Sequence, residues 1–215
     1  MGKIKIIIGI GNPDKQYYNT RHNIGFMLLD SMVKKCGTDN FEFEKKINAD
    51  VLKCPDFVFA KTKLQNRGSS ISTSRNRDRL NEKSIILAKP QTFVNKSGET
   101  VKKALAFYKL KPEQILIIHD DLDIEFGNSK FSFGKDSAGH KGVDSIIKSL
   151  KTNKFGRLRM GIANSLLKKA RHQKTLEAKK RKVGDFVLSR FTPTEQKEIQ
   201  VVFKNSFEKI KEALP

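Results

Sequence analysis

Cysteine is scarce in this chain of 215 residues, in which only Cys36 and Cys54 occur. Two cysteines this far apart in the sequence exclude a disulfide framework and a zinc site, and they favour a reducing compartment. No apolar run approaches the ~20 residues of a membrane-spanning helix. An apolar strand is expected almost from the first residue, so we also expect no signal or transit peptide. The cytoplasm is therefore the simplest location, with the matrix of mitochondria or another organelle as the alternative.

Acidic residues are also few, because 43 lysines and arginines face only 23 aspartates and glutamates, for a formal net charge of +20. Such an excess attracts polyanions, so a nucleic acid is the first partner to consider and an anionic membrane surface the second. The same composition could serve solubility alone. The length suits a sizeable core, and we expect residues 1–215 to form a single domain.

Two common motifs are missing. The run Gly9-Ile10-Gly11 lacks the third glycine of a dinucleotide-binding loop, since Asp14 stands in its place, and Pro13 removes a backbone donor. No G-x-S-x-G nucleophile elbow occurs, and no serine or cysteine lies in a recognisable nucleophile context. Attack by an activated water is therefore the simpler chemistry, and it suits an ester better than an amide.

Strand, polar loop and helix alternate along the chain. Short apolar or alternating runs predict strands at 4–8, 41–45, 50–54, 57–60, 85–88, 115–118, 131–133 and 157–162. With apolar helical stripes between them, the pattern predicts an α/β fold in which helices flank a central mixed, largely parallel, twisted sheet. Residues 62–84 are expected to form a polar loop insertion. Residues 164–182 are a basic segment that is either a helix or a mobile flap.

Polar side chains follow the predicted strands or open the predicted helices. They are Asn12, His22, Asn95, Asp120 and His140. Because the carboxyl ends of parallel strands meet at one edge of a sheet, we expect a ligand site there. A carboxylate bound to one ring nitrogen of a histidine raises its basicity, so His22 and Asp120 could together activate water. The amides of Asn12 and Asn95 could stabilise a developing oxyanion, an effect worth ~3 to 4 kcal/mol in one measured enzyme.

Other interpretations of the same residues stay open. A histidine near a helix start is often structural, and Asp120, Asp121 and Asp123 could be turn residues. These three carboxylates could instead hold Mg²⁺, which would predict a phosphoryl-transfer enzyme or a nuclease that a chelator inactivates. A basic RNA-binding protein without turnover is a further alternative.

Seven motifs carry a resemblance to a known family. They are Gly9-Ile10-Gly11-Asn12-Pro13, Thr20-Arg21-His22-Asn23-Ile24-Gly25, Lys89-Pro90-Gln91-Thr92-Phe93-Val94-Asn95-Lys96-Ser97-Gly98, His119-Asp120-Asp121-Leu122-Asp123, Gly139-His140-Lys141-Gly142, Arg157-Leu158-Arg159-Met160-Gly161-Ile162 and Phe186-Val187-Leu188. In these motifs and in their order, the chain resembles the bacterial-type peptidyl-tRNA hydrolases. The resemblance covers most of the chain apart from residues 62–84 and about 164–182.

The resemblance implies a monomeric α/β enzyme that hydrolyses the ester between a peptide and the 3′ end of tRNA, and so recycles tRNA after aborted translation. It implies no metal and no other cofactor. It makes His22 the catalytic base and Asp120 the carboxylate that orients it. Asn12 would help to select substrates with a blocked amino group, and Asn95 would hold substrate or water.

The resemblance also implies a surface that binds the substrate. Tyr17 and Phe93 match positions that meet the 3′ end of the substrate, and Arg159 matches a residue that meets tRNA phosphate. His140 and Lys141 belong to the same surface.

Three residues depart from the family pattern. Val94 stands where methionine is usual, Lys141 where asparagine is usual, and Ser132 where a phosphate-binding lysine is often found. A lysine donates hydrogen bonds but cannot accept them, so Lys141 changes how a water could be held. The basic stretches near residues 75 and 175 could supply the positive charge that Ser132 lacks.

Overall fold

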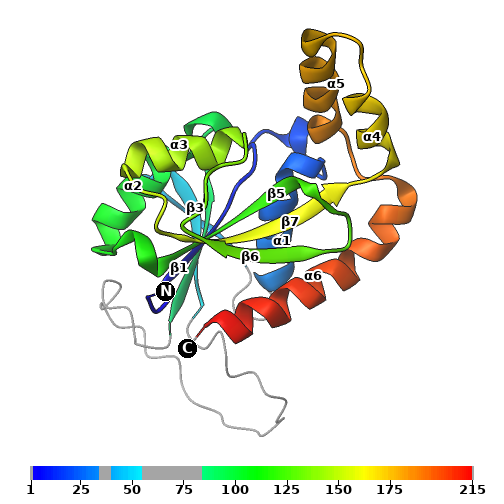
Figure 1. The fold of residues 1–215 in the computed structure, drawn as a ribbon. Coiled ribbons are helices and arrows are strands. Elements are labelled where there is room, and N and C mark those ends of the chain that lie inside the picture. The colour runs from blue at the N-terminus through cyan, green and yellow to red at the C-terminus, as the bar shows by residue number, and fades with distance from the viewer. Residues whose placement is uncertain (1, 34–39, 55–83, 215) are drawn as a thin grey trace, which may run out of the picture.

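A twisted sheet runs through the centre of the computed structural model, which describes residues 2–33, 40–54 and 84–214 (Figure 1). Its seven strands in these ranges are β1 (Ile6–Gly9), β2 (Glu42–Glu44), β3 (Ala49–Cys54), β4 (Ile85–Pro90), β5 (Ile115–Glu125), β6 (Ser129–Phe133) and β7 (Gly156–Ala163). They follow in the order β2-β3-β4-β1-β5-β7-β6. The strands β4, β1, β5 and β7 are parallel, and the pairs β2–β3, β3–β4 and β6–β7 are antiparallel. The predicted mixed, largely parallel sheet is confirmed.

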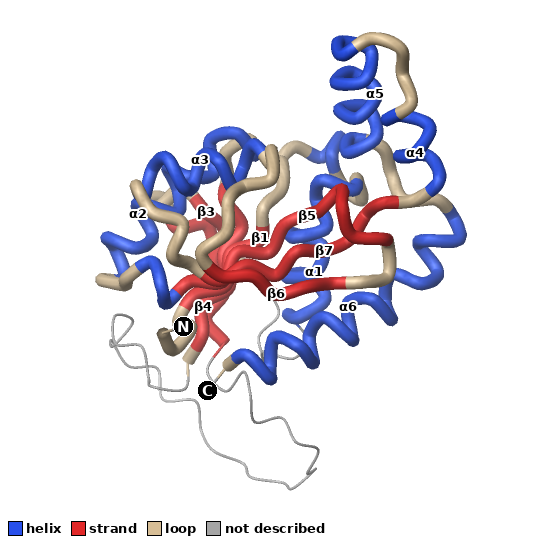
Figure 2. The backbone as a smooth tube through the Cα atoms, viewed as in Figure 1, coloured by secondary structure: helices blue, strands red, loops and turns tan. Residues whose placement is uncertain are grey.

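Helices cover both faces of this sheet (Figure 2). One face carries α1 (Ile24–Met32) and α6 (Pro193–Ala213), and the other carries α2 (Ser97–Tyr108) and α3 (Lys141–Leu150). Alternation along β5 sends Ile118 into the first layer and Ile117 into the second. Because both faces of the central strands are buried, these strands are almost continuously apolar. The predicted α/β fold with flanking helices is therefore confirmed.

Two glycines let α1 approach the sheet closely. A Cβ at Gly25 would lie 2.6 Å from the carbonyl oxygens of both Ile10 and Ile118. A Cβ at Gly11 would lie 2.8 Å from the ring of Phe26. These glycines therefore serve the packing of α1 against β1 and β5, which agrees with the missing dinucleotide-binding loop.

The strand β5 is longer than the strand predicted at 115–118. It continues through the polar run at 119–123, because His119, Asp120 and Asp121 pair in parallel register with β7. Asp120 is therefore a strand residue and not a turn residue, whereas Asp121 Oδ1 accepts a hydrogen bond from the backbone N–H of Asp123 at 2.8 Å, the local contact of an Asx turn. Pairing with β7 therefore fixes the backbone that carries these side chains.

The basic segment at 164–182 is helical. It forms α4 (Ser165–Arg171) and the first part of α5 (Leu176–Leu188), and the two helices project together from the body of the molecule (Figure 1). The second part of α5 is more apolar and packs Phe186 into the core beside α1 and α6. The helix was the correct one of the two alternatives.

Some expectations lie at or beyond the limits of the described ranges. The strand predicted at 57–60 and the polar insertion at 62–84 lie outside them. Cys54 is buried at the end of β3 and Cys36 lies outside the described ranges, so the reducing compartment stays a prediction. Among the helices of the described ranges, none is long and apolar enough to cross a membrane.

Candidate active site

His22 and Asp120 are in direct contact at the carboxyl edge of the sheet. His22 lies in the short 3-10 helix η2 (Arg21–Asn23) just before α1, and Asp120 lies on β5. His22 Nδ1 is 2.7 Å from Asp120 Oδ1. An ionised carboxylate only accepts hydrogen bonds, so the ring carries its proton on Nδ1 and leaves Nε2 as the proton acceptor.

The charge of Asp120 raises the basicity of His22. Burial by itself lowers the pKa of His22, but the carboxylate charge and its hydrogen bond raise this pKa above its ordinary value, against a smaller lowering by Lys141. Burial raises the pKa of Asp120, yet His22 and His140 outweigh burial and hold that pKa far below its usual range. Asp120 therefore stays ionised while His22 gains and loses its proton.

His140 is the second histidine on the same carboxylate. Its Nδ1 accepts hydrogen bonds from the backbone N–H groups of Gly142 and Val143, both at 3.2 Å, and so caps α3. The proton of the neutral ring must then be on Nε2, which donates to Asp120 Oδ1 at 2.9 Å. His22 and His140 therefore share one carboxylate oxygen, with ring centroids 5.2 Å apart.

The donor atoms of His22, Asp120 and His140 lie within 4.8 Å of one another, close enough to surround a metal ion. The chemistry of His140 opposes metal binding, because its Nε2 carries a proton as long as Nδ1 caps α3. Existing ion pairs also oppose a Mg²⁺ site at the three aspartates, because Asp121 is paired with Arg159 and Asp123 with Arg171, each at 2.7 Å. The three carboxylates of the acidic run therefore have separate partners and no common ligand point.

Asn12 is held by two neighbouring segments. Its backbone N–H donates to Asn23 Oδ1 and its carbonyl accepts from Asn23 Nδ2, both at 2.9 Å. Its side-chain Oδ1 accepts from the backbone N–H of Val94 at 3.0 Å. The Nδ2 group of Asn12 is therefore the donor that remains for a ligand.

Tyr17, Phe93 and Asn95 lie near this asparagine. Phe93 and Asn95 flank Val94 at the start of the 3-10 helix η4 (Val94–Lys96). The ring of Phe93 is 47% exposed and meets the edge of the Tyr17 ring, with centroids 6.3 Å apart. Asn95 is exposed. The two aromatic rings are thus in contact, and Phe93 and Asn95 adjoin the residue whose backbone N–H binds Asn12.

The basic residues of the predicted surface have different surroundings. Lys141 is exposed at the first position of α3, and its charge acts on His22. Arg159 is half-buried and donates from Nε to Asp121. Ser132 lies opposite the buried Arg157 on the next strand, and its buried hydroxyl has no hydrogen-bond partner within the described part of the chain. The expected phosphate contact of Arg159 thus competes with an existing ion pair.

Three residues near the site were not among the predicted site residues. Asn23 binds both backbone groups of Asn12, and Arg21 is fully buried beside His22. His119 is buried, and its ring meets the ring of His140 edge-on at 4.7 Å. Burial and the nearby His140 lower the pKa of His119, which stays neutral. The polar run at 21–23, unusual before an apolar helix, is the sequence signal that could have identified Arg21 and Asn23.

Known proteins match this chain along almost its whole length. The family model described as peptidyl-tRNA hydrolase matches residues 6–215. The peptidyl-tRNA hydrolases of Sulfurihydrogenibium sp. and Aquifex aeolicus are each 36% identical, over 90% and 94% of this chain and 82% and 86% of theirs.

Solved structures agree with the sequence relatives. The crystal structure of peptidyl-tRNA hydrolase from Acinetobacter baumannii is 27% identical, with a TM-score of 0.74 over 100% of this chain and 89% of that one. A complex of peptidyl-tRNA hydrolase with N-propanol matches with a TM-score of 0.72 and 27% identity, over 97% and 87% of the two chains. The protein therefore belongs to the peptidyl-tRNA hydrolase family.

Proposed function

We propose that this protein hydrolyses the ester bond between a peptide, or another N-blocked aminoacyl group, and the 3′ end of tRNA. The observation that carries the proposal is the contact of His22 with Asp120, backed by His140, in a member of the peptidyl-tRNA hydrolase family. The net charge of +20 suits a tRNA substrate. The released tRNA can then return to translation.

Water is the nucleophile in this mechanism. His22 Nε2 accepts a proton from water while the water oxygen attacks the ester carbonyl carbon, and Asp120 stabilises the imidazolium that forms. The bond from that carbon to the 3′ oxygen of tRNA then breaks, and the imidazolium returns its proton to the leaving oxygen. The products are a peptide with a free carboxyl group and a tRNA with a free 3′ hydroxyl.

Asn12 and Asn95 bind the acyl part of the substrate in this proposal. The Nδ2 group of Asn12 is the available donor because Val94 occupies its Oδ1. A donor at this place favours the carbonyl of a blocked amino group over a free, charged amino group. Asn95, exposed in η4, holds substrate or water as negative charge develops on the carbonyl oxygen.

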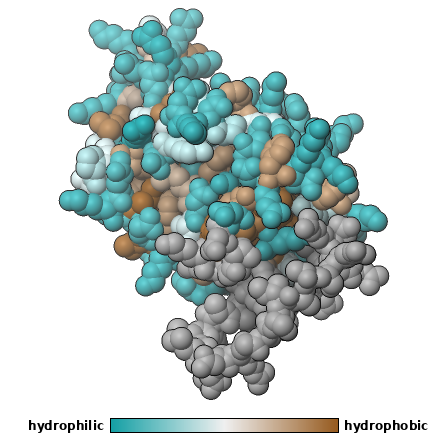
Figure 3. Space-filling view, turned by 180° about the vertical axis from the view of Figure 1, so that it is seen from behind, coloured by the Kyte–Doolittle hydropathy of each residue, from teal (hydrophilic) through white to brown (hydrophobic). Residues whose placement is uncertain are grey.

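The tRNA part would lie against aromatic and basic side chains. Tyr17 and Phe93 offer ring surface to the bases of the 3′ end, and such stacking contributes about 1–3 kcal/mol per base. Lys141 beside His140, together with Arg159, supplies positive charge for phosphate. Hydrophilic residues also gather over the projecting α4 and α5 (Figure 3).

We further propose that residues 1–215 act as one domain and as a monomer, with a polar loop insertion at about 62–84 and a basic segment at about 164–182. The cytoplasm is the proposed location, and an organelle matrix is the alternative. No metal or other cofactor takes part in the mechanism.

Release of N-acetylated amino acids from tRNA tests the proposal. We expect the purified protein to cleave this substrate equally well with and without a chelator. We expect His22→Ala to lower kcat by about 10²- to 10⁴-fold, the range for general acid–base groups. The matched control is His172→Ala, because His172 is exposed after α4 and should be dispensable.

Other outcomes would select the alternatives. Loss of cleavage in chelator would favour the Mg²⁺ enzyme. Tight tRNA binding without cleavage by the intact protein would favour an RNA-binding protein that has lost turnover. The structural reason would be Lys141, whose charge lowers the pKa of His22.

A further inference from the structure

Arg21, the residue before the proposed base, is fully buried and doubly bound to Glu195. Its two terminal nitrogens donate to the two carboxylate oxygens of Glu195 at 2.8 and 2.6 Å. Paired bonds of this kind fix the relative orientation of both groups. The Arg21 guanidinium carbon lies over the rings of Phe186 and Phe191, 4.6 and 4.9 Å from their centroids. Together these contacts fix the position of the Arg21 side chain.

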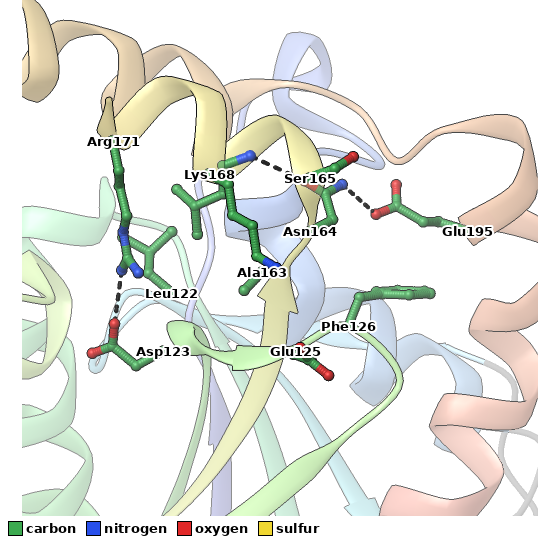
Figure 4. Close-up of a pocket in the computed structure, with 11 residues that line it drawn as sticks. Leu122, Asp123, Glu125, Phe126, Ala163, Asn164, Ser165, Lys168, Arg171 and Glu195 are labelled. Carbon is green, nitrogen blue, oxygen red and sulfur yellow. Dashed lines mark hydrogen bonds and ion pairs between the residues drawn. The ribbon is translucent and has the colours of Figure 1, made fainter. Parts of the chain in front are cut away.

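Glu195 collects hydrogen bonds from three separate parts of the chain. Besides Arg21, it accepts from the backbone N–H of Thr192 at 2.7 Å and so completes the N-terminal capping box of α6. It also accepts from Asn164 Nδ2 at 2.8 Å (Figure 4). The other side-chain atom of Asn164, Oδ1, caps α4. One carboxylate therefore joins the turn of His22, the start of α6 and the start of α4.

The backbone around Arg21 is tied to the end of α5 as well. The N–H of Arg21 donates to the carbonyl of Ser189 at 3.0 Å, and Thr20 forms an antiparallel bridge with Arg190. Arg21 Nε donates to Ser189 Oγ at 3.3 Å. The base of the α4–α5 helices and the turn that carries His22 are therefore one hydrogen-bonded unit.

We propose that the Arg21–Glu195 pair is a positioning device that holds His22 against Asp120 and joins this turn to the base of the α4–α5 helices. The inference rests on the proposed function for its kinetic test. Within the described part of the chain, the backbone of His22 makes no hydrogen bond to the sheet. Its flanking residues supply the restraint, through Arg21 on one side and Asn23 on the other.

The geometry predicts which kinetic quantity changes when the pair is broken. Glu195→Gln keeps the shape of the side chain but removes its charge, and Arg21→Lys keeps the charge but loses the paired geometry. In the folded fraction of either variant we expect kcat to fall at least tenfold, while KM for N-acetylated aminoacyl-tRNA changes by less than threefold. The reason is that both side chains are buried, where tRNA cannot contact them, while both restrain the turn that carries His22.

The pH profile separates positioning from simple loss of stability. His22 faces Asp120 from β5, His140 from the loop before α3 and Lys141 from α3. If His22 recedes from Asp120, its pKa falls, and the acidic limb of kcat/KM moves to lower pH. A variant that is merely less stable keeps the position of this limb when rates are corrected for the folded fraction.

Glu208→Gln is the matched control, because it makes the same substitution on α6 and breaks an exposed ion pair with Lys211. We expect it to match the unaltered enzyme in kcat and in pH profile. NMR titration of the His22 ring gives a readout that does not need activity, so it tests the inference even if no ester is cleaved. Unchanged kcat and unchanged His22 titration in folded Glu195→Gln and Arg21→Lys would overturn the inference.

Discussion

At the scale of the residue, one carboxylate oxygen governs the proposed chemistry. Asp120 Oδ1 accepts hydrogen bonds from the rings of both His22 and His140. Backbone N–H groups of α3 bind Nδ1 of His140, so the proton of its neutral ring is on Nε2, which faces Asp120. The same arrangement leaves His22 with its acceptor nitrogen away from Asp120. The direction of each hydrogen bond thus assigns different tasks to two chemically identical rings.

Asp120→Asn tests this assignment. The amide keeps an oxygen that accepts from both histidines but lacks the negative charge, so burial and Lys141 should now set the pKa of His22 below its ordinary value. We expect kcat to fall by about 10²- to 10⁴-fold. The pH profile of kcat/KM should show its acidic limb at lower pH. Asp123→Asn is the control, since Asp123 is exposed and pairs with Arg171 instead; equal activity of both variants would refute the role of Asp120.

At the scale of the element, the position of α1 decides where His22 can lie. The helix follows η2 directly, and Gly25 in its first turn packs against the carbonyl oxygens of Ile10 and Ile118. Any side chain at that position must push α1 away from β1 and β5. A displacement of the helix would carry His22 with it.

Gly25→Ala should therefore destabilise the fold and reduce activity together. A Cβ at 2.6 Å from two backbone oxygens forces a backbone shift, and we expect a loss of at least about 3 kcal/mol in the free energy of unfolding, at the upper end of overpacking costs. Chemical denaturation measures the change.

Gly184→Ala in α5 is the opposite case, because no atom lies within 4 Å of its added Cβ. It should stabilise the protein by ~0.5–1 kcal/mol. Equal stability of the two variants would contradict the packing argument.

At the scale of the whole molecule, the charge is unevenly placed. The projecting helices α4 and α5 carry many exposed lysines and arginines. The base of these helices is joined to the turn of His22 through Asn164 and Glu195. A surface of this kind suits the phosphates of a helical RNA that reaches beyond the active site.

Charge reversal on α5 measures this contribution. We expect Lys180→Glu with Arg181→Glu to raise KM for N-acetylated aminoacyl-tRNA and to leave kcat within twofold. The slope of log affinity against log salt should decrease by about 0.9 for each phosphate that the protein no longer neutralises. Lys102→Glu with Lys103→Glu on α2 changes the same charge on another exposed surface and should have a smaller effect. If both double variants weaken binding equally, net charge alone explains the affinity.

The sequence was sufficient for the fold and for the meeting of His22 with Asp120. Parallel strands place their carboxyl ends at one edge of the sheet. The apolar runs locate these strands in the sequence, and the polar residues after them are therefore expected at that edge. The extension of β5 was missed because buried histidine and aspartate interrupt the apolar run. Their burial depends on partners from β7 and α3, which lie far away in the sequence.

The Arg21–Glu195 pair shows what local patterns do not contain. The two residues are 174 positions apart, and the neighbouring sequence of Glu195 accounts only for its part in the capping box of α6. Its second task, as the partner of a buried arginine, follows from the packing of α6 beside η2. The same limit applies to the helices α4 and α5, whose many charges obscure the apolar spacing.

The hold on Asn12 has a consequence for how this protein can change over generations. Because a peptide N–H of residue 94 binds the amide oxygen, the side chain of Val94 is free to exchange among apolar residues of similar bulk. An exchange of this kind leaves the backbone N–H, and with it the orientation of Asn12, in place. Proline is the residue that evolution cannot place there, since it has no N–H to give.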